Sequence, residues 1–267
     1  WDKPPVLLQQ PSNAPQRKKF FLAKRELQPR QSLRKFFAIS TGDMATSFSN
    51  KQIAQAYTRS KWLQGYIAGK LAWDPVFKTA WKIIIHRGRP VLDIGCGLGL
   101  LGISMRTAGL PFRYRGVDPS IWKINKALET MRYFGFEEVA FEVNDALNTP
   151  IPQGATVFLV DVLHYLKPAE QKKMLERLAD AAEAGSLVLI RTTFKGVGLR
   201  YALTLIQEWW TRATGWIRGG AINFPVRREL LGLFKSRGLK VSVTPLWGKT
   251  PFASELIVIE PVELPPP

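Results

Sequence analysis

The stretch Val91-Leu-Asp93-Ile94-Gly95-Cys96-Gly97-Leu-Gly99 decides the fold of this chain of 267 residues. Its apolar start, residues 91–94, predicts a short buried strand, and three glycines at alternate positions follow at once. Glycines let a backbone turn sharply and approach a ligand that a Cβ would keep away. In a parallel sheet, such a loop lies at the carboxyl end of a strand, where ligands bind. The stretch therefore predicts a strand followed by a ligand-binding loop.

The spacing of the glycines narrows the class of ligand. The dinucleotide fingerprint is Gly-x-Gly-x-x-Gly directly after a strand. Counted from Gly95 the pattern fails, because Leu100 stands where the last glycine is needed. Counted from Gly97 it fits through Gly99 and Gly102, but two residues late. This disfavours NAD and FAD without excluding them, and a P-loop is excluded because no Gly-Lys-Ser/Thr ending follows.

Outward from this loop, apolar runs and helical periodicities alternate along the chain. Strands are expected at 91–94, 114–117, 139–143, 155–160, 186–190, 239–244 and 255–259. Helices are expected at 98–108, from 121, from 168, at 199–210 and at 227–237, after two or three more between 47 and 86. Strand alternating with helix predicts an α/β fold, in which a parallel sheet is covered by helices on both faces.

Polar residues follow three further predicted strands, at the positions where a parallel sheet binds ligands. The second strand ends in Asp118-Pro119, the third in Asn144-Asp145-Ala146, and the fourth in Asp161-Val162-Leu-His164-Tyr165. A carboxylate at the end of the second strand accepts two hydrogen bonds from a ribose diol. An acid beside an amide can read an adenine edge, so these residue types together predict a site for an adenosine cofactor.

Together these four motifs resemble class I S-adenosylmethionine-dependent methyltransferases, over about residues 90–260. The resemblance implies a Rossmann-like fold with seven mostly parallel strands, a reversed last strand, helices on both faces and an N-terminal helical extension. It also implies an enzyme whose cofactor is S-adenosyl-L-methionine. No metal is expected, since the chain has one cysteine, Cys96, and two histidines, His86 and His164.

Roles for the loop residues follow from the same resemblance. Asp93 and the glycine loop would hold the methionine portion, and Asp118 the ribose hydroxyls. Asp145 and Ala146 would bind the adenine, and residues 161–164 would lie beside the methyl group and the substrate. The full set of expected cofactor-binding residues is Asp93, Gly95, Cys96, Gly97, Gly99, Asp118, Pro119, Asn144, Asp145, Ala146, Asp161 and Val162.

The expected catalytic residues are His164, Tyr165 and Asp161. Methyl transfer from a sulfonium is an in-line displacement, in which the protein positions the nucleophile and excludes water. An oxygen or carbon nucleophile often needs a proton removed, and a histidine suits that task near neutral pH. His164 is the general base of this hypothesis, with Tyr165 and Asp161 beside it.

Tryptophans gather in the segments that would cover a substrate, before residue 90 and after the fifth strand. They are Trp62, Trp73, Trp81, Trp209, Trp210, Trp216 and Trp247. They favour a flat or apolar, aromatic or lipid- or polyketide-like substrate, with ordinary core packing as the alternative. Residues 59–75, with Thr250-Pro-Phe252, resemble bacterial methyltransferases of aryl-polyene and fatty-acid-like biosynthesis. That narrower resemblance implies an aromatic or polyene acyl substrate on an acidic carrier protein.

The net charge of +17 is concentrated at the front of the chain. Residues 1–90 hold 17 Lys and Arg against 4 Asp and Glu, a net of +13, and the remainder adds only +4. We expect a basic, proline-interrupted tail (1–40), a helical segment over the substrate (41–89) and a cofactor-binding catalytic domain (90–267). The basic surface of residues 1–90 suits an acidic carrier protein or an anionic membrane.

Two alternatives stay open. The basic region would also serve phosphate contacts in an RNA or other nucleic-acid methyltransferase. Against this, the fourth-strand loop reads Asp161-Val-Leu-His164, unlike the Asn/Asp-Pro-Pro-Tyr/Phe loop of enzymes that methylate base amino groups. The other alternative is a non-catalytic membrane- or partner-binding protein on the same fold, which the intact glycine loop disfavours.

The sequence also indicates a location. No apolar run approaches the roughly 20 residues of a membrane span, and the first residues lack the apolar core of a secretory signal. We therefore expect a cytoplasmic protein, with association at the inner-membrane surface left open. The chain begins with Trp1 instead of Met, so a natural start upstream is expected.

Overall fold

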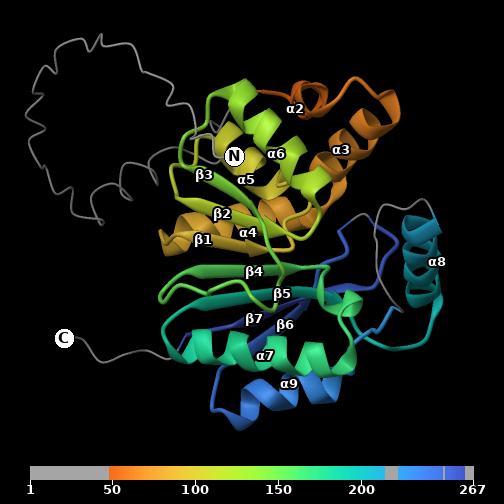
Figure 1. Ribbon diagram of the computed structural model, residues 1–267. Coiled ribbons are helices and arrows are strands. Elements are labelled where there is room, and N and C mark those ends of the chain that lie inside the picture. Colours follow the sequence, from red (N-terminus) through yellow and green to blue (C-terminus); the bar gives the residue numbers. More distant parts are fainter. Residues whose placement is uncertain (1–47, 214–221, 249, 262–267) are drawn as a thin grey trace, which may run out of the picture. The chain divides into compact units, whose positions relative to one another are not determined.

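The computed structural model describes residues 48–213, 222–248 and 250–261 (Figure 1). The basic tail predicted at 1–40 and Trp216 lie outside the described residues. No helix in the described part of the chain is long and apolar enough to cross a membrane.

Seven strands form one sheet in the order β3-β2-β1-β4-β5-β7-β6. Their bounds are β1 Val91–Ile94, β2 Tyr114–Asp118, β3 Val139–Val143, β4 Thr156–Val160, β5 Leu187–Thr193, β6 Val241–Pro245 and β7 Ser254–Ile259. Strands β1 to β5 pair in parallel, whereas β7 runs antiparallel to both β5 and β6. The predicted seven-stranded sheet with a reversed last strand is confirmed. The strand order reverses between β1 and β4, which places a ligand crevice at their carboxyl ends.

Helices cover both faces of this sheet (Figure 1). They are α2 Asn50–Tyr57, α3 Lys61–Trp73, α4 Pro75–Arg87, α5 Leu100–Thr107, α6 Ile121–Phe134, α7 Pro168–Glu183, α8 Leu199–Ala213 and α9 Arg227–Ser236, with a short 3-10 turn η1 at Leu163–Tyr165. Strand β1 shows why both faces must be covered. Val91 packs into the core with helices α2 to α6, while Leu92 and Ile94 pack into the core with α7 and α9. Successive strand residues point to opposite faces, so an apolar run is buried only between two helical layers.

Helices α2, α3 and α4, before β1, share the core of the sheet. Ile67 of α3 and Ile84 of α4 are completely buried, in the same cluster as Ile103 of α5. The hydroxyl of Tyr57 in α2 donates to the carbonyl oxygen of Leu98 at 2.9 Å, which ties α2 to the glycine loop. These helices are therefore built against the loop that the sequence marks as the ligand site.

Strand β5 is longer than the sequence predicts. The apolar run ends at Ile190, but the strand continues through Arg191 to Thr193, paired with β7 up to Ser254. Arg191 is only 6% exposed. A buried charge is tolerated in a strand when it is paired, and Arg191 pairs with two carboxylates described below. The periodicity alone could not reveal those partners.

Candidate functional site

The glycine loop after β1 is packed on two sides and open on a third. Gly95, Gly97 and Gly99 all have positive φ, at 76°, 58° and 68°. A Cβ on Gly95 would overlap Val162, and one on Gly99 would overlap the ring of Phe141. A Cβ on Gly97 would meet no atom within 4 Å. The loop therefore needs its glycines for conformation and packing, and at Gly97 it presents bare backbone to open space.

Asp118, at the end of β2, fastens this loop. Its Oδ2 accepts a hydrogen bond from the Gly97 N–H at 2.9 Å, and its Oδ1 accepts one from the Ser120 N–H at 2.9 Å. Ser120, not Asp118, is the N-cap of α6, since its Oγ accepts from the Lys123 N–H. Each carboxylate oxygen has a second lone pair, so Asp118 can still accept hydrogen bonds from a ligand.

Asp93 of β1 lies on the inner side of the same loop. Its Oδ2 accepts a 2.5 Å hydrogen bond from the hydroxyl of Tyr114 in β2. Burial raises the pKa of Asp93 to about 7, assisted by the nearby charge of Asp118 and opposed by the Tyr114 hydrogen bond. Gly102 makes room for this pair, because a Cβ there would overlap the Tyr114 ring. Gly102, the last glycine of the fingerprint when it is counted from Gly97, therefore serves packing inside the protein.

Asn144, Asp145 and Ala146 follow β3 beside Asp118. The Asn144 N–H donates to the backbone oxygen of Asp118 at 3.3 Å. Asp145 is exposed, and its Oδ1 closes a turn by accepting from the Leu147 N–H at 2.7 Å. Ala146 is buried. The predicted neighbourhood of the second and third strand ends is therefore present, with Asp145 on its outer rim.

A cavity of about 130 Å³ lies along the open side of the loop. It is lined by Asp93, Gly95, Cys96, Gly97 and Asp161 of the predicted set, by Tyr66, Lys70 and Lys123, and by apolar side chains from α4 and α5. Among the described residues, Asp118, Asp145 and His164 do not line it. Burial raises the pKa of the Cys96 thiol well above its ordinary value, so this cysteine is a small, unreactive wall of the cavity.

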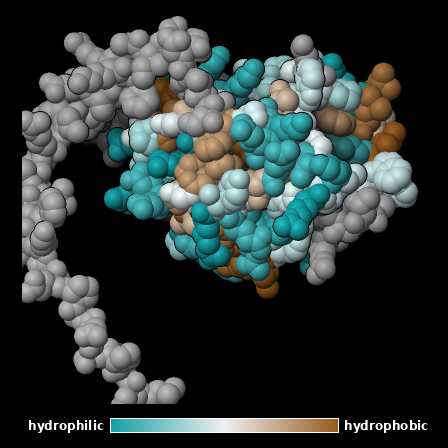
Figure 2. Space-filling model, turned by 90° about the horizontal axis from the view of Figure 1, so that it is seen from above, coloured by the Kyte–Doolittle hydropathy of each residue, from teal (hydrophilic) through white to brown (hydrophobic). Residues whose placement is uncertain are grey.

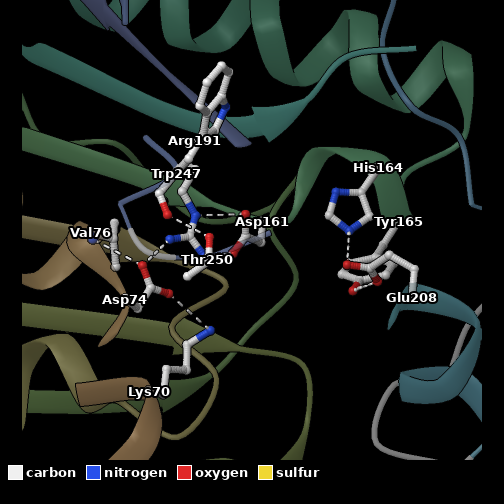
Figure 3. Close-up of polar contacts among 10 residues, drawn as sticks. All are labelled: Lys70, Asp74, Val76, Asp161, His164, Tyr165, Arg191, Glu208, Trp247 and Thr250. Carbon is white, nitrogen blue, oxygen red and sulfur yellow. Dashed lines mark hydrogen bonds and ion pairs between the residues drawn. The ribbon is translucent and has the colours of Figure 1, made fainter. Parts of the chain in front are cut away.

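Asp161, at the end of β4, belongs to a partly buried chain of charges (Figure 3). The Arg191 Nε donates to its Oδ1 at 2.9 Å, and the same guanidinium reaches Asp74, the N-cap of α4. Asp74 in turn lies 3.7 Å from Lys70 Nζ. Burial alone would raise the pKa of Asp161, but the charge and hydrogen bonds of Arg191 outweigh it and lower that pKa. Asp161 therefore stays ionised, held in a left-handed conformation with φ 57°.

His164 lies in the next turn, η1, in a separate polar cluster (Figure 3). It is 2% exposed, and its Nε2 lies 3.6 Å from a carboxylate oxygen of Glu208 in α8. Neither ring nitrogen has a hydrogen-bond partner among the described residues. The Tyr165 hydroxyl donates to Glu208 at 2.6 Å. Burial, then the charge of Glu208, raises the pKa of Tyr165, so this phenol stays protonated.

Several residues of the site, Lys123 and Asp74 among them, were not predicted from the sequence. Tyr66 and Lys70 stand one helical turn apart on α3, a spacing that places both on one helix face. Arg191 and Glu208 are charged residues within apolar surroundings, and each is less than 10% exposed. For Arg191 and Glu208, this interruption of an apolar run was the signal in the sequence that could have found them.

This strand order, with a glycine loop after β1 and an acid after β2, defines the Rossmann-like class of methyltransferase folds. Residues 66–242 match the methyltransferase domain family, and because the match spans more than half of the chain, the chain belongs to that family.

Solved structures share the fold at low sequence identity. Magnesium protoporphyrin IX methyltransferase from Synechocystis PCC 6803 with bound SAH is 17% identical, with a TM-score of 0.54, covering 86% of this chain and 99% of that one. The same enzyme with bound SAM gives 16% identity, a TM-score of 0.52 and coverages of 89% and 100%. The mitomycin 7-O-methyltransferase MmcR is 18% identical, with a TM-score of 0.54, covering 88% and 67%. Among curated proteins, none matches this chain.

Proposed function

We propose that this chain is an S-adenosylmethionine-dependent methyltransferase of a small, aromatic or lipid- or polyketide-like molecule. The observation that carries the proposal is the backbone of Gly97, which faces open space while its N–H is fastened to Asp118. A loop that is fixed on one side and bare on the other is built to hold a ligand. Membership of the methyltransferase domain family gives that ligand its class.

The residues present fit this cofactor. Asp93 offers a buried carboxyl on the cavity wall, suited to a cationic amino group. Gly95 to Gly99 would accept the methionine portion, Asp118 with Pro119 the ribose, and residues 144–146 the adenine. When bound, the cofactor supplies an electrophilic methyl group on a sulfonium. The chain itself positions the acceptor and keeps water out of the cavity.

His164 would remove the acceptor's proton. Its burial against Tyr165 and Phe224, at ring-centroid distances of 4.1 and 5.3 Å, fixes the imidazole plane. Glu208 would stabilise the charge that the imidazole gains on accepting a proton, since a carboxylate at 3.6 Å favours the cation. His164 does not line the cavity among the described residues, so this role requires an acceptor that reaches past Asp161.

Three observations favour a small, partly apolar acceptor. Tyr66 lines the cavity next to apolar side chains of α4. Two of the structures with this fold are named for a porphyrin and for mitomycin, which are ring-containing small molecules. The narrower resemblance of residues 59–75 adds an aromatic or polyene acyl chain on an acidic carrier protein to the proposal. A cytoplasmic location, with access to the inner-membrane surface, belongs to the same proposal.

Calorimetric titration of the full chain with S-adenosylmethionine tests the cofactor. We expect saturable binding at micromolar concentration, and NAD serves as the matched control ligand with an adenosine half. No binding at millimolar S-adenosylmethionine, or tighter binding of NAD, would overturn the proposal. Binding of RNA with a steep salt dependence would favour the nucleic-acid methyltransferase instead.

The base assignment has its own test. Release of S-adenosylhomocysteine is measured with a panel of phenols, aryl acids and polyene acids across pH. His164→Gln should bind cofactor normally and lose most of its turnover, at least about 100-fold. His86→Gln, at the exposed end of α4, is the control and should keep its activity. Full turnover of His164→Gln at every pH would rule out the general base.

A further inference from the structure

In helix α8, polar side chains face the protein core and apolar side chains face outward. An ordinary surface helix turns apolar residues to the core and polar ones to water. In α8, the side chains at Thr204 and Glu208 are buried, at 4% and 7% exposed. Ile206 and Trp209, on the other side, are 55% and 64% exposed.

The inner face of α8 is held by polar contacts. Glu208 accepts the hydrogen bond of Tyr165, and the Thr204 hydroxyl accepts one from the Ala253 N–H at 3.1 Å. One turn earlier, Arg200 donates to the backbone oxygen of Thr250 at 2.8 Å. These contacts fix the rotation of the helix about its axis. The outward direction of its apolar residues is therefore set by the fold.

The outer face of α8 is continuous. At 100° per residue, Leu199, Ala202, Leu205, Ile206 and Trp209 fall on one side of the helix. Each of them is exposed, and Val197 in the preceding loop is 97% exposed. Figure 2 shows hydrophobic residues gathered at the end of the molecule where Figure 1 places α8. A contiguous apolar patch of this kind marks an interaction surface.

The helix that carries this surface is attached beside the candidate site. Tyr165 donates a hydrogen bond to Glu208 of α8, and it belongs to the turn that follows Asp161, a residue of the cavity wall. Tyr66 lines the cavity and is 36% exposed, and it stacks with Trp62 at 6.2 Å. Helix α8 is therefore attached to the turn beside the cavity wall, α3 contributes Tyr66 to the cavity itself, and both helices present aromatic rings to the outside.

The charges near the outer face of α8 indicate which kind of partner binds it. The only acidic residue of α8 is Glu208, which points inward. Lys195 before α8 and Lys61 at the start of α3 are exposed. Because the exposed charges beside this face, Lys195 and Arg200, are basic, a second copy would bring like charge to it. An anionic lipid surface offers the opposite charge together with an apolar interior, and tryptophan is suited to the boundary between them.

We propose that the outer face of α8, residues 199–209, lies in the interface of an anionic lipid bilayer, with the entrance of the candidate site facing the membrane. An amphipathic helix of this kind buries its apolar side chains at the headgroup boundary, and basic neighbours add electrostatic attraction. The docking does not depend on which molecule is methylated. It would, however, let an apolar acceptor pass from the bilayer to the site without crossing water.

Cosedimentation of the full chain with extruded vesicles tests the proposal. The vesicles contain phosphatidylcholine and phosphatidylglycerol in a ratio of about two to one, or phosphatidylcholine alone. The variant Leu205→Ser/Ile206→Ser removes the apolar centre of the face, and Trp209→Ser is a second, independent variant. Tyr133→Ser on α6, at a residue 72% exposed, is the matched control for loss of an exposed ring.

We expect binding to the anionic vesicles, about tenfold weaker for either α8 variant and unchanged for Tyr133→Ser. Binding of S-adenosylmethionine should be unaffected, which shows that the variants fold and separates this test from that of the cofactor. Three outcomes would overturn the proposal: equal vesicle binding by both α8 variants, a dimer in sedimentation equilibrium that either variant abolishes, or binding to an acidic carrier protein through this face without binding to vesicles.

Discussion

The hydroxyl of Tyr114 donates a 2.5 Å hydrogen bond to Oδ2 of Asp93 across strands β1 and β2, and both side chains are buried. This bond is the main polar contact of Asp93, while Asp118 adds a second negative charge nearby. Burial outweighs the hydrogen bond and raises the pKa of Asp93 to about 7. Asp93 is therefore a carboxyl on the wall of the candidate cofactor cavity that titrates near neutral pH, and two pH-dependent properties follow.

The first is stability. The folded pKa of Asp93, about 7, lies above its ordinary value of 3.8, so the folded state holds the proton more tightly. Protonation of Asp93 therefore stabilises the folded state fully below about pH 4. This stabilisation, up to about 4 kcal/mol, is lost as the pH rises to about 7. Asp93→Asn removes the charge and should unfold at higher temperature than the wild type at pH 8. Equal melting curves at pH 8, measured by circular dichroism, would contradict this.

The second is cofactor affinity. A cation bound beside Asp93 favours the ionised carboxylate, so binding should expel a proton near neutral pH. Affinity for S-adenosylmethionine should rise with pH up to about 7 and then level off. Calorimetry at pH 6.5 in two buffers of different ionisation enthalpy measures the proton released. Asp93→Asn should bind more weakly and release none, whereas an unchanged proton count in that variant would assign the proton elsewhere.

The glycines of the loop should separate folding from ligand binding. Gly97→Ala places a Cβ in open space, so its cost is the left-handed backbone, about 1 kcal/mol. Gly95→Ala adds a collision with Val162 and should cost about 3 kcal/mol. We expect Gly97→Ala to stay folded and lose cofactor affinity, measured by urea denaturation and calorimetry. Val162→Ala should recover part of the stability lost in Gly95→Ala, and failure of both expectations would mean that the loop relaxes.

The sequence predicted this loop well because its constraints are local. A glycine with positive φ leaves its mark in the residue type itself, and Gly95, Gly97 and Gly99 could be read directly. The alternation of apolar runs with helical segments likewise predicted the sheet. Adjacent residues such as Val91 and Leu92 are both apolar because they face opposite helical layers. The reversed β7 followed from the family resemblance and not from periodicity.

Other parts of the site depend on contacts between distant residues. Arg191 pairs with Asp74, 117 positions away, and Glu208 meets Tyr165 across 43 positions. Neither pairing can be deduced from sequence spacing, because the fold of the intervening chain determines which residues meet. His164 was predicted from the strand end that it follows, but its burial against Glu208 depends on the placement of α8. Sequence patterns located the strand ends and could not locate what packs over them.

The buried charges around Arg191 lead to a further prediction. Arg191→Met would leave the half-buried carboxylates of Asp161 and Asp74 without their cation, which should cost about 3 kcal/mol, the lower end of the loss for a fully buried pair. The loss should appear as a lower urea midpoint with little change in slope. Lys172→Met is the matched control, because Lys172 pairs with Glu176 at an exposed site. Surface ion pairs contribute little, so the control should melt close to the wild type, and similar losses in both variants would contradict the prediction.

The contact between Tyr165 and Glu208 makes the last prediction, which concerns the attachment of α8. Tyr165→Phe removes the donor and leaves the carboxylate of Glu208 buried at 7% exposure. We expect a loss of about 1–3 kcal/mol in the free energy of unfolding, since a buried acceptor without a donor has lost its hydrogen bonds to water and gained none in the protein.

Glu208→Gln should cost less, because a neutral amide still accepts the hydroxyl proton. In the double variant, the two losses should not add, because the loss in Tyr165→Phe comes from a buried carboxylate without its donor and Glu208→Gln removes that charge. Amide exchange in residues 199–210 should quicken in Tyr165→Phe ahead of the rest of the chain. Strict additivity, together with unchanged exchange in α8, would show that this bond does not hold the helix.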